Sequence, residues 1–426
     1  MRRISECFLW LMLTVYLFSF GSEGYLNITA AKYVLFVILC GLYCAAMALC
    51  AIIQRRSVSP IQLLRRSSWG QRFVLLYVLL SWVSALLSPY RSDAILGLSR
   101  YEGAVTITLY GVIFLLLSVY GRPSRALLYG CGGSALVFCL LCLVQLTGRN
   151  PLGLYPEGLT WFDAGKAYSG AYLGTIGNID LVAAWLCLVI PLLWASLLRL
   201  TGHGRWLLLL PLAAALAVLL QMGVLAGLVG VGCSAVLSLP VILPLSKRPR
   251  TQLALILAGS VLLITVVLFC FDMGSGFLHE LHELLHGRID PAFGSGRLHI
   301  WREVWQRIPA HPWLGAGPDT MLHAEMTPFT RYDAELGRTL VSTIDTAHNE
   351  YLNILYHQGI LGLAAYLSAL GCLVWQWLRH SDDTATAILG AAALGYGIQA
   401  CFGFSMCMTA PYFWIVLGLL DSRRHP

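Results

Sequence analysis

Charged residues are scarce in this sequence. Asp, Glu, Lys and Arg make up 12% of its 426 residues, about half their share in an ordinary soluble protein. Apolar residues make up 58%. This composition excludes a water-soluble globular enzyme and a disordered chain, and it predicts a protein largely embedded in lipid. The net charge is +7, but the basic residues form short clusters between apolar runs instead of one basic face, so no nucleic-acid partner is expected.

The cysteines do not suggest a disulfide framework. All 13 lie within apolar runs, for example Cys139, Cys270 and Cys407, and none falls in the long polar stretch 272–347. We expect reduced thiols that act as small packing residues.

Twelve apolar runs follow one another along the chain. They lie near 7–22, 33–53, 73–88, 105–120, 126–146, 179–198, 206–220, 222–245, 253–271, 350–378, 385–404 and 406–420. A membrane-spanning helix needs about 20 apolar residues. The sequence therefore predicts an all-α polytopic membrane protein with about twelve transmembrane helices. Two boundaries are narrow, at Gln221-Met222-Gly223 and between residues 404 and 406.

Basic residues predict the orientation. With the amino terminus in the cytoplasm, seventeen Lys and Arg residues fall inside and five in the short outer loops. Basic residues concentrate on the cytoplasmic side of membrane proteins. The prediction divides the chain into helices in 1–271, a large extracytoplasmic loop with short helices at 272–347, and helices in 348–426. The first run follows Arg2 and Arg3 but shows no clear cleavage site, so we expect a membrane helix there.

The predicted outer loop 272–347 is long and rich in histidine. It has 76 residues and, with His348, holds seven of the eleven histidines. Loops of this length are usually functional or disordered, and its tryptophans argue against disorder. We therefore expect the chemistry at the outer membrane surface.

One string in this loop matches a zinc-binding pattern. His282-Glu283-Leu284-Leu285-His286 has the HExxH spacing, which places two imidazoles on one helix face, and His279 would add a third. The same residues also form the polar, solvent-exposed face of an amphipathic helix whose other face carries leucines. Both interpretations stay open.

A short helix is predicted after Gly294-Ser295-Gly296, with Pro309 and Pro312 beyond its end. Arg297 falls at or just before its first turn. There the guanidinium and the free N–H groups could together hold a phosphate or pyrophosphate. The alternative is an arginine that reaches lipid headgroups. Trp301 lies on the apolar face, which suits the membrane interface.

His348 is predicted at the start of the next long helix. Asp345 or Thr346 is the expected N-cap, which would place His348 in the first turn. The positive end of the helix dipole would keep its imidazole neutral and able to accept a proton. A structural histidine is the alternative. Elsewhere, Asn178 is the expected cap of the helix that follows it, and Arg100 is expected to pair with Glu102.

Several strings together resemble the O-antigen ligase and polymerase family of multi-span membrane glycosyltransferases. They are Ser99-Arg100-Tyr101-Glu102-Gly103, Gly174-Thr175-Ile176-Gly177-Asn178, Gly296-Arg297-Leu298-His299-Ile300-Trp301, His311-Pro312-Trp313-Leu314-Gly315-Ala316-Gly317, His348-Asn349-Glu350-Tyr351-Leu352 and Gly359-Ile360-Leu361-Gly362-Leu363. The resemblance covers roughly residues 90–370, and the ordered combination is more specific than any one string.

The resemblance implies transfer of a glycan from an undecaprenyl-pyrophosphate carrier to a glycan, lipid or polymer acceptor, at the outer face of a bacterial cytoplasmic membrane. His348 matches the family's proposed catalytic histidine, and Arg297 matches an arginine assigned to the lipid pyrophosphate. The residues expected to contact substrate are Arg100, Asn178, Trp301, Asp319 and Asn349. Membrane lipids are the other expected partners, and neither a metal nor a cofactor is expected.

One string departs from the family. Many members carry Ser-Arg-Gly at the outer edge of a middle span, where this chain has Gln221-Met222-Gly223. The second arginine is therefore missing, and Arg100 would supply its charge. The predicted transfer inverts the anomeric centre. Two other functions remain open: a zinc protease using His282, Glu283 and His286, and a lipid-linked sugar exporter, which would normally carry more charge near the middle of its spans.

Overall fold

The structure is a computed structural model that describes residues 1–54, 67–98, 100–159, 171–290, 293–294, 296–333 and 338–422. The first half forms α1 (Arg2–Leu11), α2 (Ile28–Ile53), α4 (Trp69–Leu87), α5 (Arg91–Leu96), α6 (Ala104–Tyr120) and α7 (Arg125–Leu146). A short antiparallel pair, β1 (Tyr172–Leu173) and β2 (Gly177–Asn178), leads into α9 (Ile179–Arg199), α10 (Leu209–Met222), α11 (Leu225–Ile242) and α12 (Lys247–Cys270). The predicted helical fold is confirmed.

The predicted outer loop contains α13 (Gly276–Leu285), α14 (Arg297–Arg307) and the antiparallel hairpin of β3 (Phe329–Asp333) and β4 (Arg338–Ser342). The chain continues in α15 (Glu350–Arg379), α16 (Thr384–Gln399) and α17 (Ala410–Asp421). Ser99 and Ser295 lie outside the described residues. So do seven of the basic residues counted for the orientation: Arg55, Arg56, Arg65, Arg66, Lys166, Arg423 and Arg424.

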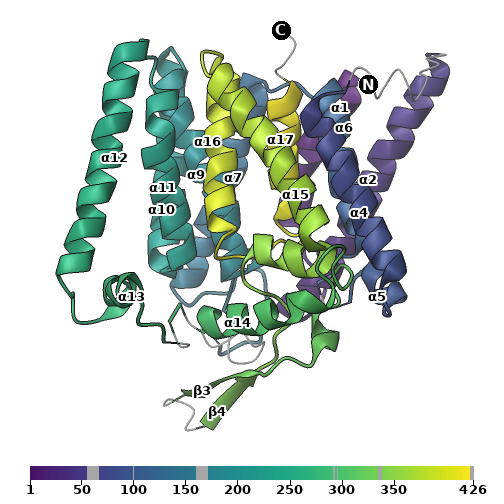
Figure 1. Ribbon diagram of the computed structural model, residues 1–426. Helices are drawn as coiled ribbons and strands as arrows, with labels where there is room; N and C mark the ends of the chain where they lie inside the picture. The colour runs from purple at the N-terminus through teal and green to yellow at the C-terminus, as the bar shows by residue number, and fades with distance from the viewer. Residues whose placement is uncertain are drawn as a thin grey trace.

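The bundle has two distinct ends (Figure 1). The start of α1 and the end of α17 lie at one end, which we call the terminal face. The segments α13, α14 and the β3–β4 hairpin lie at the opposite end, which we call the site face. The long polar stretch between α12 and α15 is thus gathered on one side of the helices.

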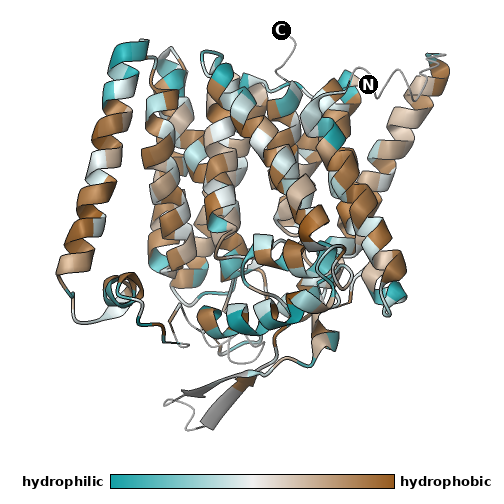
Figure 2. Ribbon diagram, viewed as in Figure 1, coloured by the Kyte–Doolittle hydropathy of each residue, from teal (hydrophilic) through white to brown (hydrophobic). Residues whose placement is uncertain are grey.

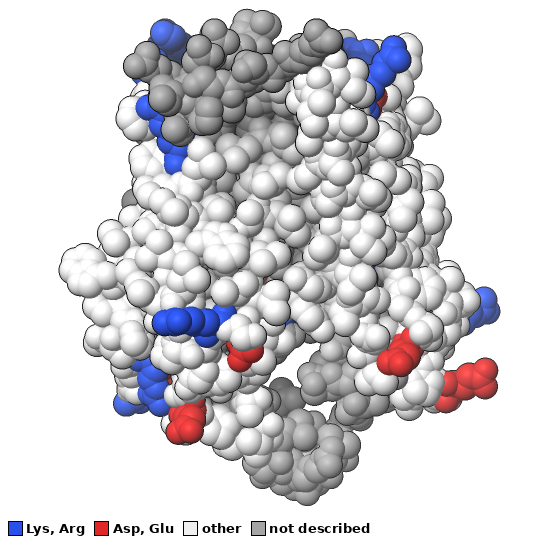
Figure 3. Space-filling view, turned by 90° about the vertical axis from the view of Figure 1, so that its right-hand side faces the viewer, with Lys and Arg blue, Asp and Glu red and all other residues white. Residues whose placement is uncertain are grey.

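Within the described residues, eight helices are long and apolar enough to cross a membrane: α2, α4, α7, α9, α10, α11, α12 and α15. Two shorter apolar helices are α6 and α17. Apolar residues run along the middle of the helices (Figure 2), and an uncharged band separates two charged ends (Figure 3). The predicted multi-pass membrane protein is confirmed at this level, while the count of twelve spans stays a prediction.

Helix ends follow local signals. Gly223 adopts the left-handed conformation with φ 63° and ends α10, so the narrow break expected near Gln221 is a real boundary. The sequence analysis placed the second boundary between residues 404 and 406, and this prediction was wrong, because the break between the two helices is longer. Helix α16 ends at Gln399 and α17 begins only at Ala410, where Pro411 lies in the first turn.

A kink in α15 docks the site-face segment onto the helices. Gly359 has φ 69° and ψ −172°, which interrupts the helix. The carbonyls of Tyr356 and His357 accept bonds from the backbone N–H groups of Ala316 and Gly317, at 2.9 and 3.0 Å. The N–H group of Ile360 donates to the Pro312 carbonyl at 2.8 Å. Non-helical backbone is tolerated within membrane helices where protein groups satisfy it, and here the chain around residues 312–317 does so.

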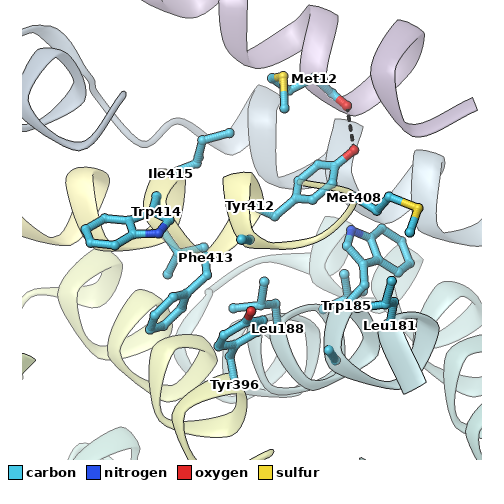
Figure 4. Packing of buried hydrophobic residues seen from close by; sticks show 14 of the residues in the cluster. Met12, Leu181, Trp185, Leu188, Tyr396, Met408, Tyr412, Phe413, Trp414 and Ile415 are labelled. Atoms are coloured by element: carbon cyan, nitrogen blue, oxygen red, sulfur yellow. Dashed lines mark hydrogen bonds between the residues drawn. The ribbon is translucent and has the colours of Figure 1, made fainter. Parts of the chain in front are cut away.

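The core is centred on α9 and α17. Trp185 of α9 is 1% exposed, and its ring lies 6.3 Å from that of Tyr412 in α17. The Tyr412 hydroxyl donates to the Met12 carbonyl at 2.9 Å (Figure 4). By contrast, α12 stands at the edge of the bundle and has no buried residue. A helix so apolar and so exposed fits a lipid-facing position.

Candidate functional site

Arg100 joins two distant segments on the site face. Its Nη2 lies 2.8 Å from Oδ1 of Asp345, and its Nε donates to Oδ2 of the same carboxylate at 3.0 Å. The guanidinium also lies 4.2 Å from the ring centroid of Phe404. Such a two-point pair, backed by an aromatic face, fixes the guanidinium plane. The predicted pairing of Arg100 with Glu102 was wrong, since the Glu102 carboxylate instead accepts from the Tyr110 hydroxyl at 2.6 Å.

Asp319 shapes the backbone that carries Arg100. Its Oδ2 accepts N–H bonds from Leu98, Arg100 and Glu102, at 2.7, 3.1 and 3.4 Å. Asp319 is 5% exposed. Burial raises its pKa, and the three N–H donors act in the opposite direction. Its carboxylate is thus committed to the 98–102 segment, not turned toward solvent.

Arg297 begins α14, as the sequence predicted. Gly296 is the N-cap, in the left-handed conformation with φ 83°. The Nη1 of Arg297 donates to the Gly294 carbonyl at 3.1 Å, and its Nη2 lies 4.0 Å from Oδ1 of Asp180. Its Nε is buried and has no hydrogen-bond partner among the described residues. Compared with Arg100, this guanidinium is weakly engaged and retains donors for an anion.

Asn178 and Asp180 begin α9 beside Arg297. The Oδ1 of Asn178 accepts the Asp180 N–H at 2.8 Å, so the predicted cap is confirmed. The antiparallel pairing of β1 with β2, in which Tyr172 lies opposite Asn178, positions Asn178. Asp180 was not expected at the site. Its only signal in the sequence was an acidic residue in a first helical turn, which the dipole alone explains.

His348 lies just before α15, not in its first turn. The predicted caps, Asp345 and Thr346, were wrong: Asn349 is the N-cap, and its Oδ1 accepts the Leu352 N–H at 3.0 Å. His348 has φ 47°, an uncommon conformation for a residue with a side chain. Its ring meets the edge of Phe404 with centroids 5.1 Å apart.

The imidazole of His348 is neutral near pH 7. Burial, together with the positive charges of Arg100 and Arg297, lowers its pKa to about 3, and Asp345 opposes them. Burial and two guanidinium groups thus favour the expected neutral state, while the contribution expected from the helix dipole stays a prediction. Because both arginines act on this one imidazole, the three predicted residues share one site.

The segment that carries His348 is held on both sides. The Trp301 Nε1 donates to the Ala347 carbonyl at 2.9 Å. From α15, Asn353 accepts the Ala347 N–H and donates to the Thr346 hydroxyl, both at 2.7 Å. Sequence reasoning missed Asn353, although a polar side chain in an apolar helix is a signal of function. Phe404 gave no signal, because it lies in an apolar run.

A small polar cavity of about 60 Å³ lies beneath the Arg100–Asp345 pair. Glu102 and Glu350 both line it, and burial raises the pKa of Glu102. Three atoms around it are buried without a hydrogen-bond partner among the described residues: Glu350 Oε2, His357 Nε2 and Gln358 Oε1. A polar cavity of this size has room for ordered water.

The HExxH string lies elsewhere, on α13 at the edge of the bundle below α12 (Figure 1). The Nδ1 atoms of His282 and His286 contact the carbonyls of Leu268 and His282, both at 2.8 Å. Glu283 pairs with Arg288 at 3.3 Å, while His279 contacts Asp272. In the described part of the chain, no three His, Cys, Asp or Glu side chains are grouped so that they could hold a metal ion.

A known family matches a segment that includes much of the site. Residues 223–367 match a family described as O-antigen ligase, so the resemblance inferred from the sequence strings is confirmed over this segment. The matched segment includes Arg297, Trp301, Asp319, His348 and Asn349, and it begins after Arg100 and Asn178. No curated protein matches the chain.

Proposed function

We propose, on the premise that residues 223–367 match the O-antigen ligase family, that the chain transfers or polymerises a glycan carried on undecaprenyl pyrophosphate. The acceptor is a glycan, lipid or polymer, the reaction uses no metal, and it inverts the anomeric centre. It takes place at the site face, which we assign to the outer side of a bacterial cytoplasmic membrane. The observation that carries the proposal is that two guanidinium groups from distant segments, Arg100 and Arg297, both act on the imidazole of His348.

Each of the three proposed chain segments contributes one of these side chains. Arg100 comes from 1–271, Arg297 from 272–347 and His348 from 348–426. The proposed outer loop thus closes the site over the helices instead of forming an independent domain.

Arg297 is the proposed direct contact of the pyrophosphate, because its guanidinium is only weakly paired. Arg100 is fixed by Asp345 and supplies the second positive charge, in the place of the arginine missing at Met222. As the bond from the sugar to the phosphate oxygen breaks, negative charge grows on the leaving group, and fixed positive charge stabilises that change.

His348 is the proposed general base. The acceptor oxygen bonds to the anomeric carbon, the bond from that carbon to the phosphate oxygen breaks, and the hydroxyl proton passes to the imidazole. With a pKa of about 3, His348 is a weak base in the free protein. The negative charge of a bound pyrophosphate offsets both arginines and raises this pKa. Donor binding would thus activate the base.

The other residues predicted to contact substrate have distinct roles. Trp301 and Asn349 line a shallow groove beside α14, where the indole can meet a sugar face. Asn178 caps α9 beside Arg297. We assign Asp319 to positioning Arg100 in place of substrate contact, because it is buried and bonded to three N–H groups.

Lipid-linked glycan analysis in a deletion strain tests the proposal. Loss of the protein should cause an undecaprenyl-linked glycan to accumulate, and the wild-type gene should clear it. The His348→Ala variant should insert in the membrane without clearing it. His380→Ala is the matched control, since His380 is exposed near the terminal face, and it should behave as wild type. Clearance by His348→Ala would remove His348 from the reaction.

A further inference from the structure

A second cavity opens at the terminal face, at the other end of the bundle from Arg100 and His348. Its volume is about 420 Å³, and it lies between α1, α7, α9, α16 and α17. Ligand pockets in proteins typically measure about 300–1,000 Å³. The proposed transfer reaction makes no use of it.

The inner part of this cavity is apolar. Figure 4 shows residues that line it from three directions: Met12 after α1, Trp185 and Leu188 on α9, and Tyr412 and Ile415 on α17. The Tyr412 hydroxyl is already bonded to the Met12 carbonyl. A water molecule would need several polar partners to stay in such a place. The inner part therefore favours a hydrocarbon occupant.

The mouth of the cavity is polar and carries two basic side chains and one acidic side chain. Arg125, exposed at the start of α7, and Arg199, at the end of α9, both line it. Arg199 donates through Nη2 to the Ser381 carbonyl, and its buried Nε has no partner among the described residues. Asp383 is the one acidic residue in the lining, and its Oδ2 accepts from the N–H and hydroxyl of Thr386, at 2.9 and 2.7 Å.

We propose that this cavity binds one chain of an anionic membrane lipid from the leaflet at the terminal face, with the lipid phosphate held by Arg125 and Arg199. The apolar depth fits an acyl chain, and the two guanidinium groups fit a phosphate. Basic pockets between membrane helices recognise anionic headgroups in this way. The site is separate from the donor site, because the two lie at opposite ends of the helices.

Native mass spectrometry of the purified full chain tests this site. The probes are phosphatidylglycerol and phosphatidylcholine with the same acyl chains, each added to delipidated protein. Wild type should bind one phosphatidylglycerol about tenfold more tightly than phosphatidylcholine, because two arginines face the phosphate. Equal binding of the two lipids would overturn the proposal.

Two variants locate the site. The double variant Arg125→Gln/Arg199→Gln should lose the tenfold preference, and Ala385→Phe, which narrows the cavity, should lose both lipids. Arg248→Gln is the matched control, because Arg248 is exposed near the same face but does not line the cavity. If Ala385→Phe fails to fold, the double variant decides the question. A preference for phosphatidylglycerol retained by the double variant would contradict the proposed site.

Discussion

Arg100 and Asp345 form a two-point ion pair, at 2.8 and 3.0 Å, across 245 positions of sequence. The pair connects the segment before α6 to the segment before α15, which also carries His348. It therefore sets the position of the proposed base relative to a fixed positive charge.

Replacement of Arg100 by Lys keeps the positive charge but loses the two parallel N–H donors that bond to Asp345. An ammonium group cannot reproduce both bonds to Asp345 in one plane. We expect the rate of transfer to fall about tenfold to a hundredfold, the cost of about one charge-assisted hydrogen bond. Arg91→Lys, at an exposed arginine on the same face, should leave the rate unchanged. A wild-type rate for Arg100→Lys would show that the pair is not needed.

Replacement of Asn353 by Leu removes both side-chain bonds to the Thr346–Ala347 backbone segment while keeping the volume similar. His348 would then be less firmly placed, and we expect kcat to fall at least about tenfold, because misplacement of a reacting group by about 1 Å is costly. The KM for the donor should change little, since Arg297 is not touched. A variant with raised KM and normal kcat would assign Asn353 to donor binding instead.

The kink at Gly359 gives a stability prediction. A Cβ at Gly359 would lie 2.3 Å from the Trp313 carbonyl carbon, and φ there is 69°. Gly359→Ala should therefore lower the free energy of unfolding by at least about 2 kcal/mol and loosen the docked 312–317 segment. Gly371→Ala, in the same helix with open space around the Cβ position, should be neutral or slightly stabilising. Thermal unfolding in detergent compares the two, and equal midpoints would mean that the kink is not constrained.

Acid should destabilise the protein through His348. Its pKa is about 3 in the folded chain and about 6.5 when unfolded. Between these values the unfolded state binds the proton and the folded state does not, so this contribution to stability is lost as the pH falls below about 6.5. At pH 5.5 the loss is about 1–2 kcal/mol. His348→Gln should show a smaller drop in unfolding midpoint between pH 7.5 and 5.5 than wild type, and equal drops would place the imidazole in contact with solvent.

Local sequence signals predicted the helices and some of their ends well. Asn178 caps α9, Arg297 begins α14 and Gly223 ends α10, because each depends on neighbours within a few residues. The cap of α15 was missed because Asp345, a good cap by type, is bound to Arg100 from a distant segment. The stretch 400–409 reads as apolar, yet it is not helical between α16 and α17.

The site itself was only partly predictable. The family strings brought out Arg100, Arg297 and His348, but no pattern along the chain shows that Asp345 pairs with Arg100 or that Phe404 contacts both Arg100 and His348. These are contacts between segments that meet only after the helices pack. The neutral state of His348 was expected from the helix dipole alone, since the burial and the two arginines that lower its pKa are properties of the assembled site.

Binding and transfer measured side by side on the same purified variants offer the sharpest test of the shared role of Arg297 and His348. With undecaprenyl pyrophosphate as ligand, His348→Ala should bind as wild type does, while Arg297→Gln should bind about tenfold more weakly, since a charge-assisted contact is lost. With the lipid-linked glycan, neither variant should transfer at a measurable fraction of the wild-type rate. Transfer at the wild-type rate by His348→Ala would contradict the role of His348 as the base. Unchanged diphosphate binding by Arg297→Gln would contradict the role of Arg297 in binding the pyrophosphate.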